Sequence, residues 1–543
     1  MIKQVILGTM LLSMGSYVHA QSSSTVNQNG NNNSGAVAQE GADQRSVIRV
    51  FGNSNKTNVT QKGSDQNAVI QVAGNGSSDG NKVNVSQESG ENNNATVYVA
   101  GDGNTVRMTQ DGENNNNLHA GAEFSAAPRG VDIYGNNNTA KTEQTGDNNE
   151  GFIKIGDNGG TGEANGNYAE IRQHAPGGND NFATITVTGN NNYAEVDQDG
   201  DNDFTQINQS GDGNRAVTEQ WNGTGTGEIF IDQMGNNNSA NSFQDGINSL
   251  SDIDQSGNGN SAKTSQTGFN ADSDIDQSGN GNMANVVQGG VNSESDIMQG
   301  GNNNNAVVDQ AGLNNYSEIT QALGGNGNKA KVTQTAGISD ESFINQTGSN
   351  NTANVTQEGT AFFFIAGNLS DIDQSGDGNK AVVDQTNLNG SSINQGGNNN
   401  TAKVTQVGGN LSSIDQSANG NKATVDQTGT NLSAITQSGN GNTAKATQSG
   451  GGIISLNVSD IDQSGNNNNA VLSQNGLLNV STISQGGNSG IARVTQDGTG
   501  NLSDISQSGG AGNKAIVTQT GALNTSGVMQ VGSNNMIKVT QSN

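Results

Sequence analysis

Pairs of aspartates two positions apart recur along the chain and are the first residues that could do chemistry. The pairs are Asp252/Asp254, Asp274/Asp276, Asp371/Asp373 and Asp460/Asp462. Two carboxylates can serve as general acid and general base when a cleft desolvates one of them and separates their pKa values. Residues two apart in a strand share one face, so each pair is expected on an exposed sheet surface without a cleft. We therefore predict that these carboxylates are not catalytic and that their charge slows premature association.

Other residues that could react or bind a metal are sparse. The chain has no cysteine and three histidines, which excludes disulfides and thiolate metal sites. His119 and His174 lie far apart in the sequence, so no Ser–His–Asp group can be assembled from them. The aspartates lie in predicted strands rather than in the glycine turns where calcium-binding β-rolls carry them. We expect no enzymatic activity, no cofactor and no metal site.

The composition alone is typical of a disordered chain. Of the 543 residues, 29% are hydrophobic, 3% are aromatic and 79 are glycine, which leaves little apolar surface to offset the entropy of ordering. The net charge of −28 argues against nucleic acid as a partner, because phosphate binding needs clustered Lys and Arg. A repeated sequence can nevertheless bury a core by stacking its copies, so the periodicity decides the fold class.

The N-terminal segment 1–20 predicts a secretory signal peptide. Lys3 precedes an apolar stretch at positions 5–14, and Val18-His19-Ala20 fits cleavage after Ala20. The apolar stretch is too short to span a bilayer, and no later segment is long and apolar enough to do so. We therefore expect an exported protein that does not span a membrane.

A repeat organises the rest of the chain. Glutamine recurs at a constant interval, and a glycine follows it two places later in most copies. The clearest run has these glutamines and glycines: Gln255, Gln266, Gln277, Gln288, Gln299 and Gln310, with Gly257, Gly268, Gly279 and Gly290. Ile253 and Ala262 occupy different slots, and each slot returns only at every second glutamine, so the full unit consists of two related halves.

Each half-unit alternates between two kinds of side chain. In residues 260–266, Asn260, Ala262, Thr264 and Gln266 fall on one face of a strand and polar residues fall on the other. The glycines and asparagines that follow tolerate the left-handed backbone of a turn. Each unit therefore predicts strand, turn, strand, turn, and stacked units would form a β-solenoid with two sheets.

Stacking would place each glutamine about 4.8 Å from its equivalent in the next coil, where side-chain amides can hydrogen-bond along the axis. Such a ladder allows a polar core, because each buried amide finds a partner in the neighbouring coil. We expect the six glutamines of the clearest run to form structural ladders, and Asn260, Asn282 and Asn304 to form a second kind.

The repeat resembles a known family. The pattern Ser/Asn-x5-Gln-x-Gly-x-x-Asn-x-Ala-x-Val-x-Gln, present at residues 293–310 and 368–385, is similar to the curlin repeat of bacterial curli subunits. The resemblance implies an all-β, cross-β stack of strand–turn–strand units, here roughly two dozen coils long. It also implies a subunit that polymerises with itself as a functional amyloid on the surface of a Gram-negative bacterium. Its implied roles are adhesion and biofilm matrix, and its implied partners are a nucleator subunit, a curli-type secretion pore and matrix components.

The repeat divides the mature chain into three segments. Residues 21–110 and 187–543 are predicted to be curlin-like repeats, and residues 111–186 a degenerate region. Pro128 and Pro176 lie in that region and are expected to leave the sheets as loops, because proline lacks a ladder donor. Phe362–Phe364 interrupt a later repeat and are expected to pack over a sheet edge or to form a contact point.

The two ends decide between two functions. The inward set Asn535, Ile537, Val539 and Gln541 repeats almost to the last residue, so we expect Ile537, Lys538, Val539 and Gln541 to form a polymerisation edge. An uncapped solenoid end can accept another copy, and head-to-tail addition without a closing rotation gives filaments. The alternative is a monomeric secreted β-solenoid that acts as an adhesin or binds a ligand.

Overall fold

The computed structural model describes residues 21–73, 78–117, 130–157, 164–174, 179–221, 225–359, 367–450 and 456–543. The predicted signal peptide, His119, Pro128, Pro176 and Phe362–Phe364 lie outside the described residues. The described part consists of strands, turns and short connections and contains no helix. Within the same ranges, there is accordingly no helix long and apolar enough to cross a bilayer.

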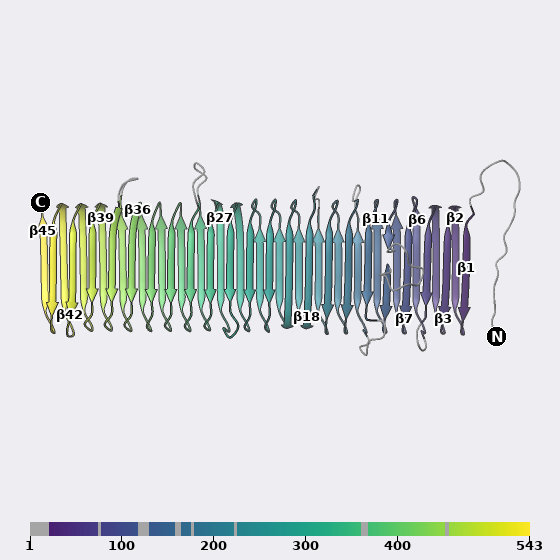
Figure 1. The fold of residues 1–543 in the computed structure, drawn as a ribbon, viewed down its shortest axis with the longest axis horizontal. Coiled ribbons are helices and arrows are strands. Elements are labelled where there is room, and N and C mark those ends of the chain that lie inside the picture. Colours follow the sequence, from purple (N-terminus) through teal and green to yellow (C-terminus); the bar gives the residue numbers. More distant parts are fainter. Residues whose placement is uncertain are drawn as a thin grey trace. The chain divides into compact units, whose positions relative to one another are not determined.

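The fold is the predicted one, an all-β parallel β-solenoid of about 22 turns. The chain forms two compact units, residues 1–270 and 271–543. In each unit the strands alternate along the chain between two parallel sheets, here named sheet A and sheet B, except that β9 (Asn116–Asn117) and β10 (Val131–Tyr134) both lie in sheet A. Figure 1 shows the arrows of the two sheets pointing in opposite directions, as expected when the chain turns back after each strand.

The strands of the first unit are as follows. Sheet A contains β1 (Ser23–Asn29), β3 (Arg45–Phe51), β5 (Asn67–Val72), β7 (Asn94–Ala100), β9 (Asn116–Asn117), β10 (Val131–Tyr134), β12 (Glu150–Ile155), β14 (Phe182–Thr188), β16 (Phe204–Ser210), β18 (Glu228–Asn236) and β20 (Leu250–Asn258). Sheet B contains β2 (Ser34–Ala42), β4 (Lys56–Ser64), β6 (Lys82–Ser89), β8 (Thr105–Asp111), β11 (Thr139–Thr145), β13 (Tyr168–Gln173), β15 (Tyr193–Gln198), β17 (Arg215–Gln220), β19 (Ser239–Gln244) and β21 (Ser261–Gln266).

The second unit continues the alternation. Its sheet A contains β22 (Asp272–Gln277), β24 (Glu294–Gln299), β26 (Tyr316–Gln321), β28 (Glu341–Gln346), β30 (Leu369–Gln374), β32 (Gly390–Gln395), β34 (Leu411–Gln416), β36 (Thr430–Gln437), β38 (Leu456–Gln463), β40 (Val480–Gln485), β42 (Leu502–Ser508) and β44 (Thr525–Val531). Its sheet B contains β23 (Met283–Gln288), β25 (Asn305–Leu313), β27 (Lys329–Ile338), β29 (Thr352–Glu358), β31 (Lys380–Thr386), β33 (Thr401–Val407), β35 (Lys422–Thr428), β37 (Thr443–Ser449), β39 (Asn469–Leu477), β41 (Ile491–Thr499), β43 (Lys514–Ala522) and β45 (Met536–Ser542).

Strands pair in register, so identical positions of the repeat stack on one another. In sheet A, Gln277 lies beside Gln299, and Gln299 beside Gln321. The register survives a change of coil length. The coil from Gln374 to Gln395 is one residue shorter than the coil from Gln277 to Gln299, and it still places glutamine beside glutamine. Length variation is therefore absorbed in the turns, while the strands stay aligned.

The interior is filled by small and β-branched side chains next to the glutamines. Every second residue of a strand faces inward, and the inward residues of one coil are at most 2% exposed: Ser273, Ile275 and Gln277 in sheet A, and Ala284, Val286 and Gln288 in sheet B. Burial of an isoleucine or valine side chain contributes about 1.5–3 kcal/mol. The predicted dry part of the core, represented by Ile253, Ile297 and Val308, is buried in the same way.

The segment 111–186 also carries paired strands. Both β9 and β10 pair with β7, at Asn94↔Asn116 and Val97↔Val131, so together they occupy one strand position, although residues 118–130 separate them in the sequence. On sheet B, β11 pairs with β8 and β13, and Gln144 lies beside Gln173. The sequence pattern placed this segment outside the regular repeats because its insertions shift the glutamine phase.

The neighbouring coil leaves no room for a side chain at the glycine that follows each glutamine. A Cβ atom on Gly279 would lie 1.8 Å from the carbonyl oxygen of Gly301, and one on Gly246 would lie 1.8 Å from that of Gly268. The expected left-handed conformation occurs at the glycine position itself in Gly257, with φ of 102°. In the turns after Gln277 and Gln288 it occurs two residues later instead, at Gly281 with φ of 67° and Asn292 with φ of 52°. Close coil stacking, more than the turn itself, therefore requires glycine after glutamine.

We predict that Gly279→Ala destabilises the second unit by about 1–3 kcal/mol, as expected when an extra methyl is forced into a packed structure. Gly527→Ala is the matched control, because a Cβ at Gly527 meets no atom within 4 Å. Chemical denaturation followed by circular dichroism measures both. An equal loss of stability in the two variants would contradict the proposed role of coil contact.

Candidate functional site

The predicted glutamines are buried in two columns, one in each sheet. In sheet A the Gln277 carboxamide donates to Gln299 Oε1 at 2.7 Å, and Gln299 donates to Gln321 at 2.8 Å. In sheet B, Gln288 donates to Gln310 at 3.0 Å. In the first unit, Gln255 and Gln266 accept from the glutamines of the preceding coil, each at 2.8 Å.

The second amide hydrogen joins the two sheets. Gln288 in sheet B also donates to the carbonyl of Asp272, at the start of the sheet A strand of the same coil, at 2.7 Å. Gln299 and Gln310 make the equivalent bonds to the carbonyls of Met283 and Glu294, both at 3.0 Å. Gln299 and Gln310 thus each use both amide hydrogens and the oxygen. Sequence spacing predicted the bond along the column but not the bond across the coil.

The glutamine column of sheet A is interrupted in the first unit. From β3 to β14 the same position carries aliphatic residues, for example Val50, Val72 and Val187, and the glutamines resume at Gln209, which lies beside Val187. Because valine offers no donor, the Oε1 atom of Gln209 is buried without a hydrogen-bond partner. A ladder therefore needs glutamine in successive coils, and its first member leaves one group unsatisfied.

The predicted asparagines bind the main chain of the adjacent coil, whereas Asn431 and Asn457 also form a side-chain ladder, with Asn431 donating to Asn410 Oδ1 and Asn457 to Asn431 Oδ1, both at 3.0 Å. The backbone N–H of Asn304 donates to Oδ1 of Asn282 at 2.9 Å, and Asn282 Nδ2 donates to the carbonyl of Gly301 at 2.8 Å. Asn260 likewise donates through its backbone N–H to Asn238 Oδ1 at 3.0 Å. The side chain of asparagine is shorter by one methylene, so at the turn it reaches backbone atoms of the adjacent coil.

Two coils in the described part of the chain carry a buried aspartate at this asparagine position. Asp203 is 4% exposed and follows Asn181 in the column, whose Oδ1 accepts from the Asp203 backbone N–H at 2.8 Å. Burial raises the pKa of Asp203 to about 7, against the lowering effect of backbone hydrogen bonds. Burial also raises the pKa of Asp340, whose Oδ2 atom is buried without a partner. In the register of the repeat that contains Gln198, Asp203 occupies the position that carries asparagine in other coils. The repeat pattern alone did not identify it as a functional residue.

Two of the outward aspartates lie in a groove, whereas a sheet surface without a cleft was expected. Asp371 and Asp460 line a groove of about 540 Å³ on sheet A of the second unit, together with leucines such as Leu411 and Leu432. Burial raises the pKa of both carboxyls, and the neighbouring Asp373 and Asp462 add to the effect. The surface is not flat here because the residues between them, such as Ser392 and Ala434, are small. The lining of the groove includes no histidine, lysine or arginine beside the carboxylates.

The predicted polymerisation residues lie in β45. This strand pairs with β43 in register, with Ile537 beside Ala515, Val539 beside Val517 and Gln541 beside Gln519. Ile537, Val539 and Gln541 are only half-buried, and Lys538 is exposed. The inward residues of β45 therefore follow the sequence pattern of an interior strand, but their side chains are less buried than those of an interior strand.

Six segments of the chain match one family model, the curlin associated repeat. They are residues 79–112, 164–200, 290–322, 397–429, 487–521 and 510–542. The chain carries multiple repeats of the curlin associated repeat family. The matches with a curlin repeat include 164–200, which begins inside the segment 111–186, and 510–542, which contains β45.

Curlin repeats are structural rather than enzymatic. The stacked glutamine columns and the family together fit self-assembly. A comparison with curated proteins found no match.

We predict that Gln299→Ala destabilises the curlin-repeat stack, whereas Asp276→Asn does not. The alanine leaves Gln277, Gln321 and the Met283 carbonyl each without one bond, at about 1–3 kcal/mol for a buried unsatisfied group. Burial raises the pKa of Asp276, so removing its charge is neutral or speeds assembly. Unfolding midpoints and dye-monitored assembly rates measure both effects, and equal effects would show that the two faces are assigned incorrectly.

A second prediction concerns pH. The folded-state pKa of Asp203, about 7, lies above the ordinary value of about 3.9, so the folded state holds an extra proton between these values. The contribution of Asp203 to the free energy of unfolding is fully present below about pH 4 and is lost as the pH rises to 7. Asp203→Asn should therefore raise the unfolding midpoint more at pH 8 than at pH 5. Asp245→Asn, at an exposed residue of the same unit, is the control, and an equal gain at both pH values in Asp203→Asn would contradict the prediction.

Proposed function

We propose that the protein is the structural subunit of a secreted, curli-like amyloid fibre that grows head to tail on the cell surface. The curlin repeats support a structural role, and the polymer would serve adhesion and biofilm matrix. In this proposal the chain has no enzymatic activity and needs no cofactor. Its principal partner is a second copy of itself.

The observation that carries the proposal is the direction of the glutamine bonds at β45. Gln541 accepts from Gln519 at 2.8 Å and donates one hydrogen to the carbonyl of Thr525 at 2.8 Å. Its second amide hydrogen has no acceptor among the described residues. In β2, Gln39 donates to Gln61 at 2.8 Å, so its oxygen faces the opposite way. The donor of one copy and the acceptor of another are therefore complementary.

Burial of apolar side chains also favours the addition of a second copy at β45. Ile537 and Val539 of β45 are half-buried, whereas their equivalents Ala515 and Val517 one coil earlier are fully buried. If β1 and β2 of a second copy stack on β44 and β45, the contact repeats the coil spacing within the chain and covers these side chains. Because such addition has no closing rotation, it produces a filament rather than a ring.

Export of the chain and its assembly outside the cell are part of the same proposal. A signal peptide at residues 1–20 would export the chain, and the site of assembly would be outside a Gram-negative cell. A nucleator subunit, a curli-type secretion pore and matrix components would be further partners in this assembly route.

The alternative function is a monomeric secreted adhesin or ligand-binding protein. The groove on sheet A favours it, because Leu411 is 58% exposed there and large exposed apolar residues in a row mark interaction surfaces. A purified chain that stays monomeric by sedimentation at all concentrations, with no fibres in electron micrographs, would support the alternative over the fibre.

We predict that Lys538→Pro folds but elongates fibres at least tenfold more slowly. One coil earlier, the N–H of Lys514 donates forward to the Asn535 carbonyl at 2.7 Å, and Met536 is the equivalent of Lys514 in β45. Because alternate N–H groups of a strand point the same way, the N–H of Lys538, two positions after Met536, lies at the outer edge. Proline deletes this donor without removing a bond to β43.

Lys538→Ala is the control, since it keeps the backbone N–H, and it should elongate like the wild type. Seeded growth followed with an amyloid dye gives the rates, and circular dichroism of the monomers checks folding. A small fraction of the proline variant should also slow growth of wild-type fibres, because it can add through β1 and β2 and then block the end. Growth of Lys538→Pro at the wild-type rate would refute this edge as the growing surface.

A further inference from the structure

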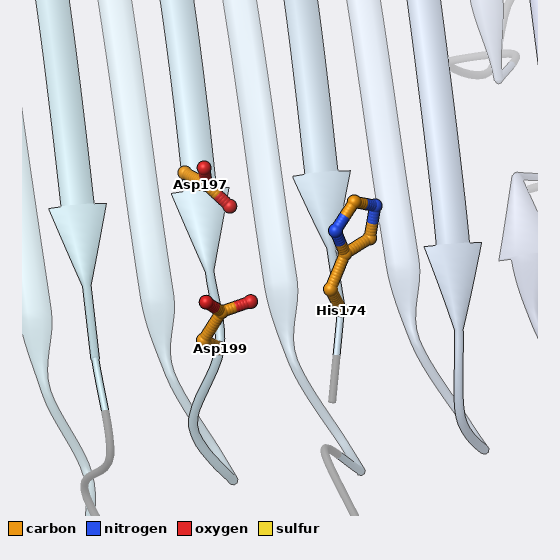
Figure 2. A group of neighbouring side chains, drawn as sticks. All are labelled: His174, Asp197 and Asp199. Atoms are coloured by element: carbon orange, nitrogen blue, oxygen red, sulfur yellow. The ribbon is translucent and has the colours of Figure 1, made fainter. Parts of the chain in front are cut away.

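A mixed group of possible metal ligands lies on the outer face of sheet B in the first unit. Figure 2 shows His174, which follows β13, beside Asp197 and Asp199 at the end of the neighbouring strand β15. One ligand atom from each residue lies within 4.8 Å of the others. The register fixes this grouping, because Gln173 pairs with Gln198 and the His174 N–H donates to the Gln198 carbonyl at 2.9 Å.

The ligand atoms are available for binding. Arg172 holds only Oδ2 of Asp197, through Nε at 3.3 Å and a terminal nitrogen at 3.2 Å, so Oδ1 makes no bond to it. The Nε2 atom of His174 is buried without a hydrogen-bond partner, and its nearest anion is Glu143 Oε1 at 3.7 Å. Arg172 therefore orients Asp197, and the imidazole has an unused buried nitrogen beside two carboxylates.

The local charge attracts a cation. Arg172 also pairs with Glu195 and Glu170, and Lys141 pairs with Glu170 at 3.5 Å. The group thus contains five carboxylates, Glu143, Glu170, Glu195, Asp197 and Asp199, against the three cations Arg172, Lys141 and Arg215, the last of which acts on Glu195.

We propose that His174, Asp197 and Asp199 form a binding site for a divalent transition-metal ion, with Zn²⁺ as the best match. An imidazole nitrogen with two carboxylate oxygens suits Zn²⁺, whereas Ca²⁺ and Mg²⁺ prefer oxygen ligands alone. Zinc–ligand bonds of about 2.0–2.2 Å require the three surface side chains to close by rotation, and water would complete the coordination. The ion would join β13 to β15 and so clamp two adjacent coils.

The site differs from the expectation that the chain has no metal site. Its histidine follows β13, and its aspartates lie in and directly after β15, so their spacing resembles no linear metal motif. They meet only because the coil between β13 and β15 places residues next to successive glutamines side by side.

Isothermal titration of the tag-free full chain with ZnCl₂ tests the proposal. We expect one ion per chain with micromolar affinity, retained in excess CaCl₂, and a rise in the thermal unfolding midpoint. His174→Gln and Asp199→Asn should each weaken binding at least tenfold and abolish that rise.

Two controls separate this site from general binding. Asp245 occupies the same position after Gln244 as Asp199 does after Gln198, so Asp245→Asn should bind zinc like the wild type. His119→Gln should do so as well. Absence of zinc binding, equal affinity in all four variants, or displacement of zinc by equimolar calcium would overturn the proposal.

Discussion

The structure depends on the need of a buried carboxamide for three hydrogen bonds. A glutamine in the interior has two hydrogens and an oxygen to satisfy, and each group left unpaired costs about 1–3 kcal/mol. Gln299 satisfies them with the coil before, the coil after and the opposite strand of its own coil. Where glutamines stack, this requirement fixes the register of the strands and the distance between the sheets, which a core of isoleucine and valine alone would not do as strictly.

The same requirement explains which changes the chain tolerates. Residues can be added or removed in the turns, as in the shortened coil from Gln374 to Gln395, because the glutamines still meet. Replacement of glutamine by valine is tolerated when it extends over neighbouring coils, as from Val50 to Val187, since an apolar column has nothing to satisfy. The energetic cost arises where the valine column meets the glutamine column, because Gln209 Oε1 is left there without a hydrogen-bond partner. Neighbouring repeats are therefore expected to change together rather than singly.

The sequence predicted the solenoid, the inward and outward faces and the glutamine columns, because these follow from alternation and a constant period. It did not predict that Gln288 bonds across the coil to Asp272, since that contact depends on the separation of the sheets. The close approach that requires Gly279 and the grouping of His174 with Asp199 were also missed, because both arise between coils. Asp203 follows the asparagine register, but its raised pKa depends on burial. Local pattern thus determines the strands, and the chemistry arises where coils touch.

The direction of the amide ladder has a consequence for the kinetics of a fibre. Within each unit, the glutamine-to-glutamine bonds of the described residues run from donor to acceptor toward higher residue numbers, as from Gln416 to Gln437 and Gln437 to Gln463. Aligned amide dipoles add, as they do in an α-helix, and give the two ends of a stack opposite partial charges. A filament of such copies would be electrically polar, so its ends should capture monomers at different rates and respond differently to ionic strength. Growth would then be vectorial, and the faster end would be set by side-chain amides in the core.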